Sequence, residues 1–278
     1  MIKTLMRFLF LGDIVGKTGC TAVFRELPHL IERWRLDFVV VNGENASNGF
    51  GITQDDYQDL LAAGANVVTT GNHAFQYKET LKFANDSDHF LRPANFSQGT
   101  AGKGSGLFIA KNGAHVLVAN VLGNVFMPCA ADDPFETAEK IVSACSLGEQ
   151  ADAIIFDFHA EATSEKQCFG HFLDSRVSVV VGTHTHIPTA DAQILEGGSA
   201  YMSDAGMCGD YNSSLGMDKE EPLHRFLYKK KLGHFEPAQG SATLCGLAVE
   251  LSDRTGLAEK VSAVRLGPHL KPEVPDFW

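Results

Sequence analysis

Residues 151–161, ADAIIFDFHAE, and residues 177–186, VSVVVGTHTH, are two apolar runs that end in acidic residues, threonines and histidines. Residues 164–174, which lie between them, have the spacing of a helix. Apolar runs rich in β-branched residues that alternate with helices are typical of strands buried on both faces of a sheet. This stretch therefore indicates an α/β fold.

The same alternation is present nearer the amino terminus. Residues 8–11, 37–42 and 66–73 are predicted to form strands, and the third runs into a loop. Residues 18–34 have helical periodicity, and residues 53–64 begin with a threonine cap and end with a glycine, as helices do.

Four later segments are less helical and look like hairpin strands: GLFIA (106–110), HVLVANVLG (115–123), AQILEGGSAYMSD (192–204) and ATLCGLAVEL (242–251). We therefore expect a mixed α/β sandwich of two sheets with helices outside. No internal repeat or linker is evident, so residues 1–278 are predicted to form a single domain. The proline-rich residues 267–278 are expected to lie across its surface.

The composition narrows the class of partner. The 278 residues are 44% hydrophobic and 21% charged, which suits a folded chain with a sizeable core. The net charge of −11 argues against a broad face for duplex nucleic acid, which requires clustered lysine and arginine. This negative charge does not exclude a small phosphorylated substrate that is held by metal ions.

The cysteines and the amino terminus favour a cytoplasmic protein. The six cysteines form no C-x-x-C pair, which suggests free thiols in a reducing compartment. The opening MIKTLMRFLFLGD is too short to span a membrane and has no signal cleavage site, so no membrane association is expected.

Residues 11–19, LGDIVGKTG, end like a phosphate-binding P-loop but lack its spacing. A P-loop has a glycine five positions before Gly-Lys-Thr, and Leu11 occupies that position here. The carboxylate of Asp13 would repel a phosphate unless a cation lay between them. We therefore expect Asp13 to hold a cation, and Lys17 and Thr18 to begin the following helix.

Five predicted strands end in residue types that bind metals. Sites in open α/β sheets form beyond the carboxyl ends of the strands, so these side chains should converge on one pocket. The candidates, in chain order, are Asp13, then Asn42, Glu44 and Asn45, then Asn72 and His73, then Asp157, His159 and Glu161, and finally His184 and His186.

Most of these residues have a simpler explanation when taken alone. Asp13 could cap a turn or helix, residues 44–45 could form a solvated turn, and Asn72 could form an Asx-turn. The pair His184 and His186 is harder to explain, because an extended G-T-H-T-H segment places two imidazoles on one side. The coincidence of five such endings favours one shared site.

Asp157 and His159 leave two alternatives open. His159 alone could be a hydrogen-bonded histidine at a strand end. Asp157 could share a face with it, either holding a ligand imidazole or simply being buried with a hydrogen bond. The irregular residues 203–218 could form a wall of the pocket or a plain connection.

In this order, the motifs GD-x-x-G, N-G-E-N, G-N-H, D-F-H-A-E and G-T-H-T-H resemble those of the calcineurin-like metallophosphoesterases. They are most similar to the bacterial YmdB-like branch, the 2′,3′-cyclic-nucleotide 2′-phosphodiesterases. The likeness runs nearly end to end and includes RPANF (92–96), GKG (102–104), DFHAEATSEK (157–166) and GTHTHIPTAD (182–191).

The resemblance implies a four-layer αββα sandwich with a dinuclear metal centre. One metal would be bound by Asp13, Glu44, Asn45 and His186, and the other by Glu44, Asn72, His159 and His184. Glu44 would bridge the two ions, and His73 would act on the substrate.

One departure from the wider superfamily concerns the metals. The first motif there is usually D-x-H, whereas Ile14 and Val15 follow Asp13 here, and the bridging residue there is usually aspartate. The mixed oxygen and nitrogen donors suit manganese, iron or zinc better than magnesium or calcium, and the resemblance favours iron or manganese.

These residues predict hydrolysis of a small phosphodiester. A hydroxide shared by two divalent or trivalent ions would attack phosphorus, and His73 would protonate the leaving 2′-oxygen of a 2′,3′-cyclic nucleotide to give a 3′-nucleotide. The alternatives are a phosphomonoesterase or nucleotidase on the same centre, or a metal-bound regulatory protein that acts through a partner. Homo-oligomerisation stays open.

Overall fold

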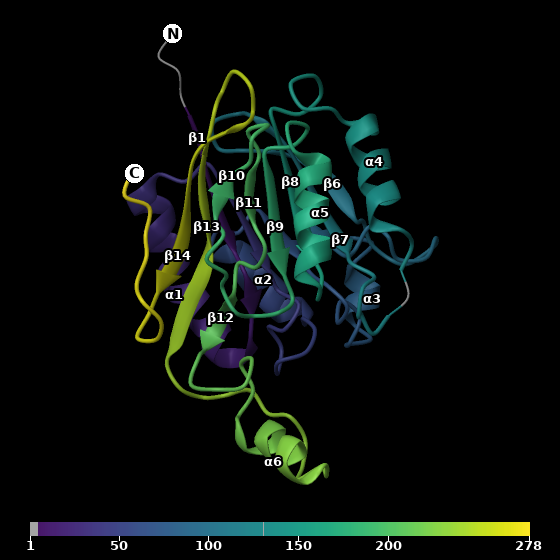
Figure 1. The fold of residues 1–278 in the computed structure, drawn as a ribbon, viewed down its shortest axis with the longest axis vertical. Coiled ribbons are helices and arrows are strands. Elements are labelled where there is room, and N and C mark those ends of the chain that lie inside the picture. Colours follow the sequence, from purple (N-terminus) through teal and green to yellow (C-terminus); the bar gives the residue numbers. More distant parts are fainter. Residues whose placement is uncertain (1–4, 130) are drawn as a thin grey trace.

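A computed structural model describes residues 5–129 and 131–278 and contains two β-sheets that lie face to face (Figure 1). The first sheet has eight strands in the order β2-β12-β13-β1-β3-β4-β5, with β14 paired to β13. Its strands are β1 (Met6–Leu11), β2 (Asp13–Ile14), β3 (Phe38–Asn42), β4 (Val67–Thr69), β5 (Phe90–Leu91), β12 (Met207–Asp210), β13 (Ala242–Leu251) and β14 (Ala258–Leu266).

The second sheet has six strands in the order β10-β11-β9-β8-β7-β6. They are β6 (Ser105–Ile109), β7 (His115–Leu122), β8 (Ala153–His159), β9 (Val179–Thr183), β10 (Gln193–Ile194) and β11 (Ala200–Met202). Both sheets mix parallel and antiparallel pairs, as the sequence predicted. The unit β8-α5-β9 is parallel, and β6 with β7 forms an antiparallel pair.

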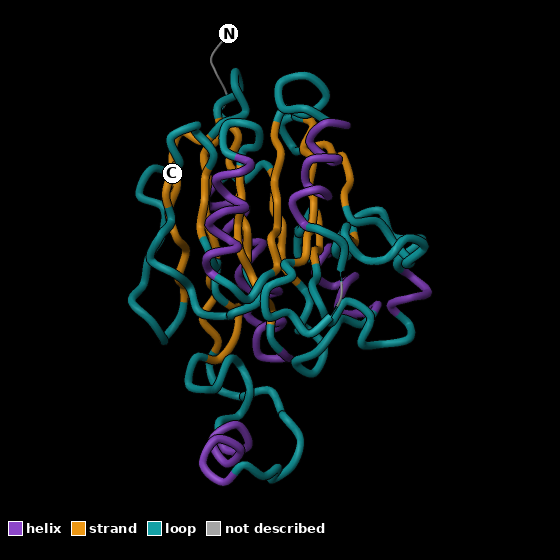
Figure 2. The backbone as a smooth tube through the Cα atoms, turned by 45° about the vertical axis from the view of Figure 1, so that its right-hand side comes forward, coloured by secondary structure: helices purple, strands orange, loops and turns teal. Residues whose placement is uncertain are grey.

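The helices are α1 (Gly16–Trp34), α2 (Gln54–Ala62), α3 (Thr80–Phe83), α4 (Pro134–Ala144), α5 (Thr163–Leu173) and α6 (Glu220–Tyr228). Helix α1 begins two residues before the predicted start, and α2 has the expected threonine cap, with Thr53 accepting from the Asp56 amide. The sequence did not predict α3, α4 or α6. Helix α6 lies apart from both sheets (Figure 2).

Alternate side chains of β1 point into two different cores, one on each face of the first sheet. Phe8 and Phe10 lie in the core between the two sheets, whereas Leu9 and Leu11 lie in a second core shared with α1 and α2. A third core joins the other sheet to α4 and α5. The successive layers are therefore helices, sheet, sheet and helices, which confirms the four-layer αββα sandwich.

Strand register brings the carboxyl ends of neighbouring parallel strands level. Asn42 at the end of β3 pairs with Thr69 at the end of β4, and His159 at the end of β8 pairs with Thr183 at the end of β9. Loops that leave these ends start from a common edge, which positions the site described next.

Other predictions concern the surface and the cysteines. The carboxyl-terminal segment lies on the outside of the molecule, where Trp278 packs on Trp34 with ring centroids 5.5 Å apart. All six cysteines are free. Within the described residues, every helix is too short or too polar to cross a membrane.

Candidate metal centre

The five predicted strand ends meet at one edge of the sandwich. Asp13 begins β2 directly after β1, and Glu44 and Asn45 follow β3. Asn72 follows β4, His159 is the last residue of β8, and both His184 and His186 follow β9. Glu44, Asn45, His186, Asp13 and His159 are buried, whereas Asn72 and His184 are half-buried.

Four of these side chains converge closely. The Nε2 atom of His159 lies 3.1 Å from Glu44 Oε1 and 3.2 Å from Asn72 Oδ1. The Nδ1 atom of His184 lies 3.2 Å from the same His159 Nε2. Ligand atoms of Glu44, His159 and His184 all lie within 4.8 Å of one another. Three lone-pair donors this close suit a shared cation.

The other three candidates are more widely spaced. The Nε2 atom of His186 lies 3.9 Å from Asp13 Oδ1. Asp13 Oδ1 and Asn45 Oδ1 are both buried without a hydrogen-bond partner among the described residues. A buried oxygen without a partner costs free energy, and a bound cation would supply the missing contact.

Gly71 provides the space for this convergence, and the sequence did not single it out as a site residue. A Cβ atom at position 71 would collide with Glu44 Oε2 and with His159 Nε2. Any larger residue would therefore displace both donors. The only sequence signal was its place in the G-N-H motif.

Charges within the site shift the pKa values in opposite directions. Burial alone would raise the pKa of Glu44, but the adjacent imidazoles, His159 foremost, hold it below the ordinary range. Burial alone would lower the pKa of His159, but the charges of Glu44 and Asp13 raise it to about 9. Burial, with the charge of His159 adding to it, lowers the pKa of His184 to about 3. A cation bound here must therefore displace a proton from His159 but not from His184.

The two histidines after β9 differ from the sequence prediction. They do not continue an extended strand, because His184 has φ 93° and His186 has φ 65°. Such left-handed backbone costs free energy for a non-glycine residue and persists only where neighbouring contacts fix it. The prediction of an extended G-T-H-T-H segment is wrong because the strand ends at Thr183.

Asp204 fixes the backbone between these histidines. Its Oδ2 accepts hydrogen bonds from the amide of Thr185 at 3.1 Å and from the Thr185 hydroxyl at 2.6 Å. The buried ammonium of Lys166 lies 2.8 Å from the same oxygen and neutralises the carboxylate. Asp204 belongs to residues 203–218, for which the sequence left a pocket wall and a plain connection open, and its supporting role was not predicted.

A hydrogen bond orients the imidazole of His186, and a carboxylate lies beside the outer nitrogen of His184. The Leu215 carbonyl lies 2.9 Å from His186 Nδ1, which leaves Nε2 facing Asp13. Glu161 Oε2 lies 3.2 Å from His184 Nε2, which leaves Nδ1 facing His159. For His186 one nitrogen is hydrogen-bonded to the protein and the other points into the site, as metal-binding histidines require, whereas for His184 the outer nitrogen lies beside a carboxylate.

His73 lies beside the donor set without joining it. Its backbone amide donates to Glu44 Oε2 at 3.2 Å, and its half-buried ring packs edge-on against Phe50 at 5.1 Å between centroids. Burial lowers the pKa of His73, and the Glu44 carboxylate opposes that shift. The ring of His73 therefore lies beside Glu44, half-buried and packed on Phe50.

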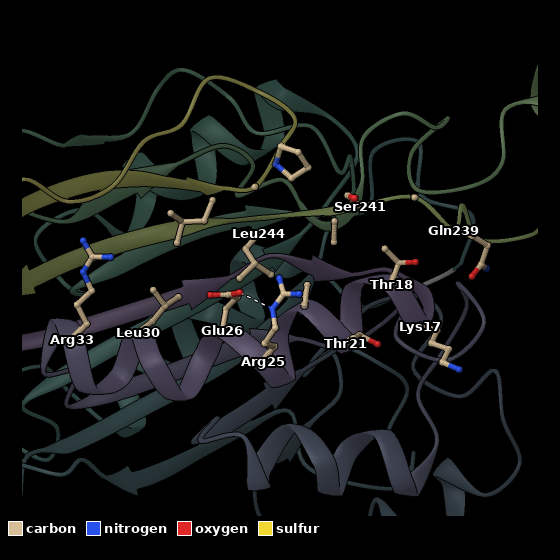
Figure 3. Close-up of a pocket in the computed structure, with 16 residues that line it drawn as sticks. Lys17, Thr18, Thr21, Arg25, Glu26, Leu30, Arg33, Gln239, Ser241 and Leu244 are labelled. Atoms are coloured by element: carbon tan, nitrogen blue, oxygen red, sulfur yellow. Dashed lines mark hydrogen bonds and ion pairs between the residues drawn. The ribbon is translucent and has the colours of Figure 1, made fainter.

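A cavity of about 740 Å³ lies elsewhere, along α1 and the ends of β13 and β14 (Figure 3). Its lining includes Lys17, Thr18 and Arg25 but none of the seven candidate ligands. Lys17 and Thr18 lie in the first turn of α1, as predicted. These two residues are therefore separate from the candidate metal centre.

The residues present fit a metal centre. Three imidazoles, two carboxylates and two amide oxygens form a mixed donor set without thiolate, which suits manganese, iron or zinc. Within residues 5–129 and 131–278, Oδ1 of Asp13 and Oδ1 of Asn45 have no hydrogen-bond partner, and Gly71 leaves space beside Glu44 and His159. Both features suit bound cations.

The chain is similar to known proteins along almost its whole length. A family model described as YmdB-like protein matches residues 9–264. The chain is 41% identical over 259 residues to the 2′,3′-cyclic-nucleotide 2′-phosphodiesterase of Bacillus subtilis strain 168, covering 93% of this chain and 96% of that protein.

Two solved structures are similar in fold and sequence. A hypothetical protein from Thermus thermophilus has a TM-score of 0.86 at 39% identity and covers 95% of this chain and 100% of its own. A novel phosphatase from Mycoplasma pneumoniae has a TM-score of 0.89 at 33% identity, with coverages of 96% and 95%.

Proposed function

The chain belongs to the YmdB-like protein family, and on that premise we propose that it is a metal-dependent phosphodiesterase that opens small 2′,3′-cyclic nucleotides to 3′-nucleotides. The observation that carries this proposal is the convergence of Glu44, His159 and His184. Asp13 and Asn45, predicted to share the site, each have a buried oxygen without a partner in the part of the chain that the structure describes. The name of the Bacillus subtilis relative supports the choice of substrate.

Two ions would be held in this arrangement. Asn72, His159 and His184 would bind one ion together with Glu44, and Asp13, Asn45 and His186 would bind the other. Glu44 has one oxygen beside His159 and the other accepting the His73 amide, and we propose that its carboxylate bridges the two ions. Manganese or iron is proposed as the physiological metal, with zinc as the alternative.

When bound, the two ions supply an acidified water as nucleophile and neutralise the charge that develops on the phosphoryl oxygens. The protein's own groups act around that chemistry. Glu44 and Asp13 hold negative charge where the cations are needed, and Gly71 keeps the donors close enough to share them.

His73 would protonate the leaving 2′-oxygen. Its ring is half-buried, lies beside Glu44 and is steadied by Phe50. General acid catalysis of this kind typically contributes about 10²–10⁴-fold to a rate. The role requires an imidazole within hydrogen-bond reach of the substrate, which the partial exposure of His73 allows.

A phosphomonoesterase is the second candidate, because the similar Mycoplasma pneumoniae structure is described as a phosphatase. Both activities would use the same ions and differ in whether the phosphoryl group carries one or two ester bonds.

A substrate panel separates the two candidates. Metal-free protein reloaded with manganese would be assayed on 2′,3′-cyclic AMP, 3′,5′-cyclic AMP and 5′-AMP, with product identified by chromatography. We expect fastest hydrolysis of the 2′,3′-cyclic nucleotide and 3′-AMP as the product. Preferred hydrolysis of 5′-AMP, or formation of 2′-AMP, would contradict the proposal.

A further inference from the structure

A buried polar layer lies between the two sheets, directly beneath the candidate metal centre. Along β3, β4, β7, β8 and β9, alternate side chains fill the core between the sheets until close to the carboxyl end of each strand. At that level the strands carry fully buried polar residues instead: Asn42, Thr69, Asn120, Asp157 and Thr183.

Asp157 is the hub of this layer. Its Oδ2 accepts from Asn42 Nδ2 at 2.9 Å, from Thr69 Oγ1 at 2.5 Å and from Asn120 Nδ2 at 3.3 Å. Its Oδ1 accepts from Thr183 Oγ1 at 2.6 Å. Donors from both sheets therefore meet on one carboxylate. Burial raises the pKa of Asp157, and the charge of His159 and the hydrogen bonds from Thr183, Thr69 and Asn42 oppose that rise.

The orientation of the Asn42 amide group supports its role as a donor to Asp157. Asn42 Oδ1 accepts the backbone amide of Glu44 at 3.0 Å, so its Nδ2 must point to Asp157. Asn42 therefore links Asp157 to the loop that carries Glu44.

The hydrogen bonds of Thr183 then show that Nδ1 of His159 is a donor. The one hydroxyl proton of Thr183 is given to Asp157, so Thr183 Oγ1 can only accept a further hydrogen bond. His159 Nδ1 lies 2.9 Å from that oxygen and must therefore carry a proton. In the metal-free protein a second proton lies on Nε2, beside the Glu44 carboxylate. When a cation displaces that second proton, Nδ1 keeps its own proton, and the Nε2 lone pair faces Glu44, Asn72 and His184.

We propose that Asp157 and Thr183 are positioning residues that act as a relay, holding His159 in the tautomer and orientation that present Nε2 to a metal ion. This inference rests on the proposed function, because it assigns His159 as a ligand. The relay differs from a direct carboxylate–histidine contact, since the threonine hydroxyl sets the direction of both hydrogen bonds.

The chain offers a matched control. Thr69 and Thr183 are both fully buried, both end a strand, and both donate a hydroxyl proton to Asp157. Only Thr183 also accepts from a candidate ligand. Thr183→Val and Thr69→Val each remove one hydrogen bond to Asp157, and only the first breaks the relay.

The test measures manganese affinity by calorimetry and the melting temperature of the metal-free proteins. We expect similar losses of melting temperature in both variants, a roughly 10–100-fold weaker manganese affinity in Thr183→Val, and near wild-type affinity in Thr69→Val. Thr183→Ser, which keeps the hydroxyl, should restore the affinity. Equal affinities in the two valine variants would overturn the relay.

A measurement on the wild-type protein covers the case in which Thr183→Val does not fold. In zinc-loaded protein, nitrogen-15 NMR of His159 should show a proton on Nδ1 and none on Nε2, and a bare Nδ1 would overturn the relay. If the wild-type protein binds neither manganese nor zinc, it is the proposed function that fails. If it binds them while Thr183→Val binds equally well, only the relay fails.

Discussion

The donor set has two unlike halves. Glu44, Asn72, His159 and His184 form a compact half whose polar atoms already lie 3.1–3.2 Å apart around His159 Nε2. Asp13, Asn45 and His186 form an open half, in which the nearest Asp13–His186 approach is 3.9 Å and two oxygens lack partners among the described residues.

The difference has an electrostatic origin. In the compact half, an ion pair between Glu44 and His159 can take the place of a metal contact. In the open half, burial raises the pKa of Asp13, and the charges of His186 and His159 offset that effect only in part. A metal-free protein can thus satisfy the compact half internally, whereas the open half depends on a cation.

The largest effect is expected from Glu44→Gln, because Glu44 serves both halves. Loss of its charge should reduce bound manganese to below one ion per chain and lower turnover on the order of 10⁴-fold or more. Glu165→Gln is a matched control, since Glu165 is also buried but accepts the amides of Asn124 and Val125 instead. Two tightly bound ions in Glu44→Gln would refute the bridging role.

The next largest effect is expected from His73→Ala. This residue lies outside both halves, so metal content should stay at the wild-type value while turnover falls roughly 10²–10⁴-fold. Elemental analysis of the purified variant, run beside the activity assay, distinguishes the two quantities. A metal-depleted His73→Ala protein would show that His73 is a ligand.

Asp13→Asn tests the open half alone. The amide keeps an oxygen donor but removes the charge, so one ion should be lost and turnover should fall about 10²-fold. Manganese titration followed by electron paramagnetic resonance should show a single ion without exchange coupling. Retention of a coupled pair would mean that the open half does not depend on Asp13.

The most gradual effect, spread over several pH units, concerns metal affinity. His159 in the metal-free protein has a pKa of about 9, above its ordinary value of 6.5. Its ring therefore carries two protons and a positive charge throughout the neutral range. A cation must displace that proton, so manganese affinity should rise with pH by up to about tenfold per unit from pH 6.5 to 9 and then level off. Calorimetry in buffers of different ionisation enthalpy should detect the released proton, whereas an affinity that falls with pH would contradict the assignment.

Much of the compact half could be predicted from sequence, because its donors follow apolar strands directly. The register of the sheet positions a donor that lies at or just after a strand end, as it does for Asn72 and His159. His184 and His186 were identified as site residues, but their left-handed backbone was not, since it depends on Asp204 and Lys166 from distant segments.

The supporting residues were harder to predict because their role arises only from packing. Gly71 matters through the space it leaves, and Leu215 acts through a carbonyl that any residue possesses. The helices α4 and α6 were missed because the sequence segments around them were interpreted as loops or left unassigned. Asp157 was noticed, but its route to His159 through Thr183 was not.

Anomalous diffraction from manganese-soaked crystals tests the central claim most directly. The account predicts two manganese peaks about 3.5–4 Å apart, with Glu44 contacting both. One peak should lie on the side of Asp13 and His186, and the other on the side of His159 and His184. A single peak in an active protein, or peaks that Glu44 does not touch, would contradict it.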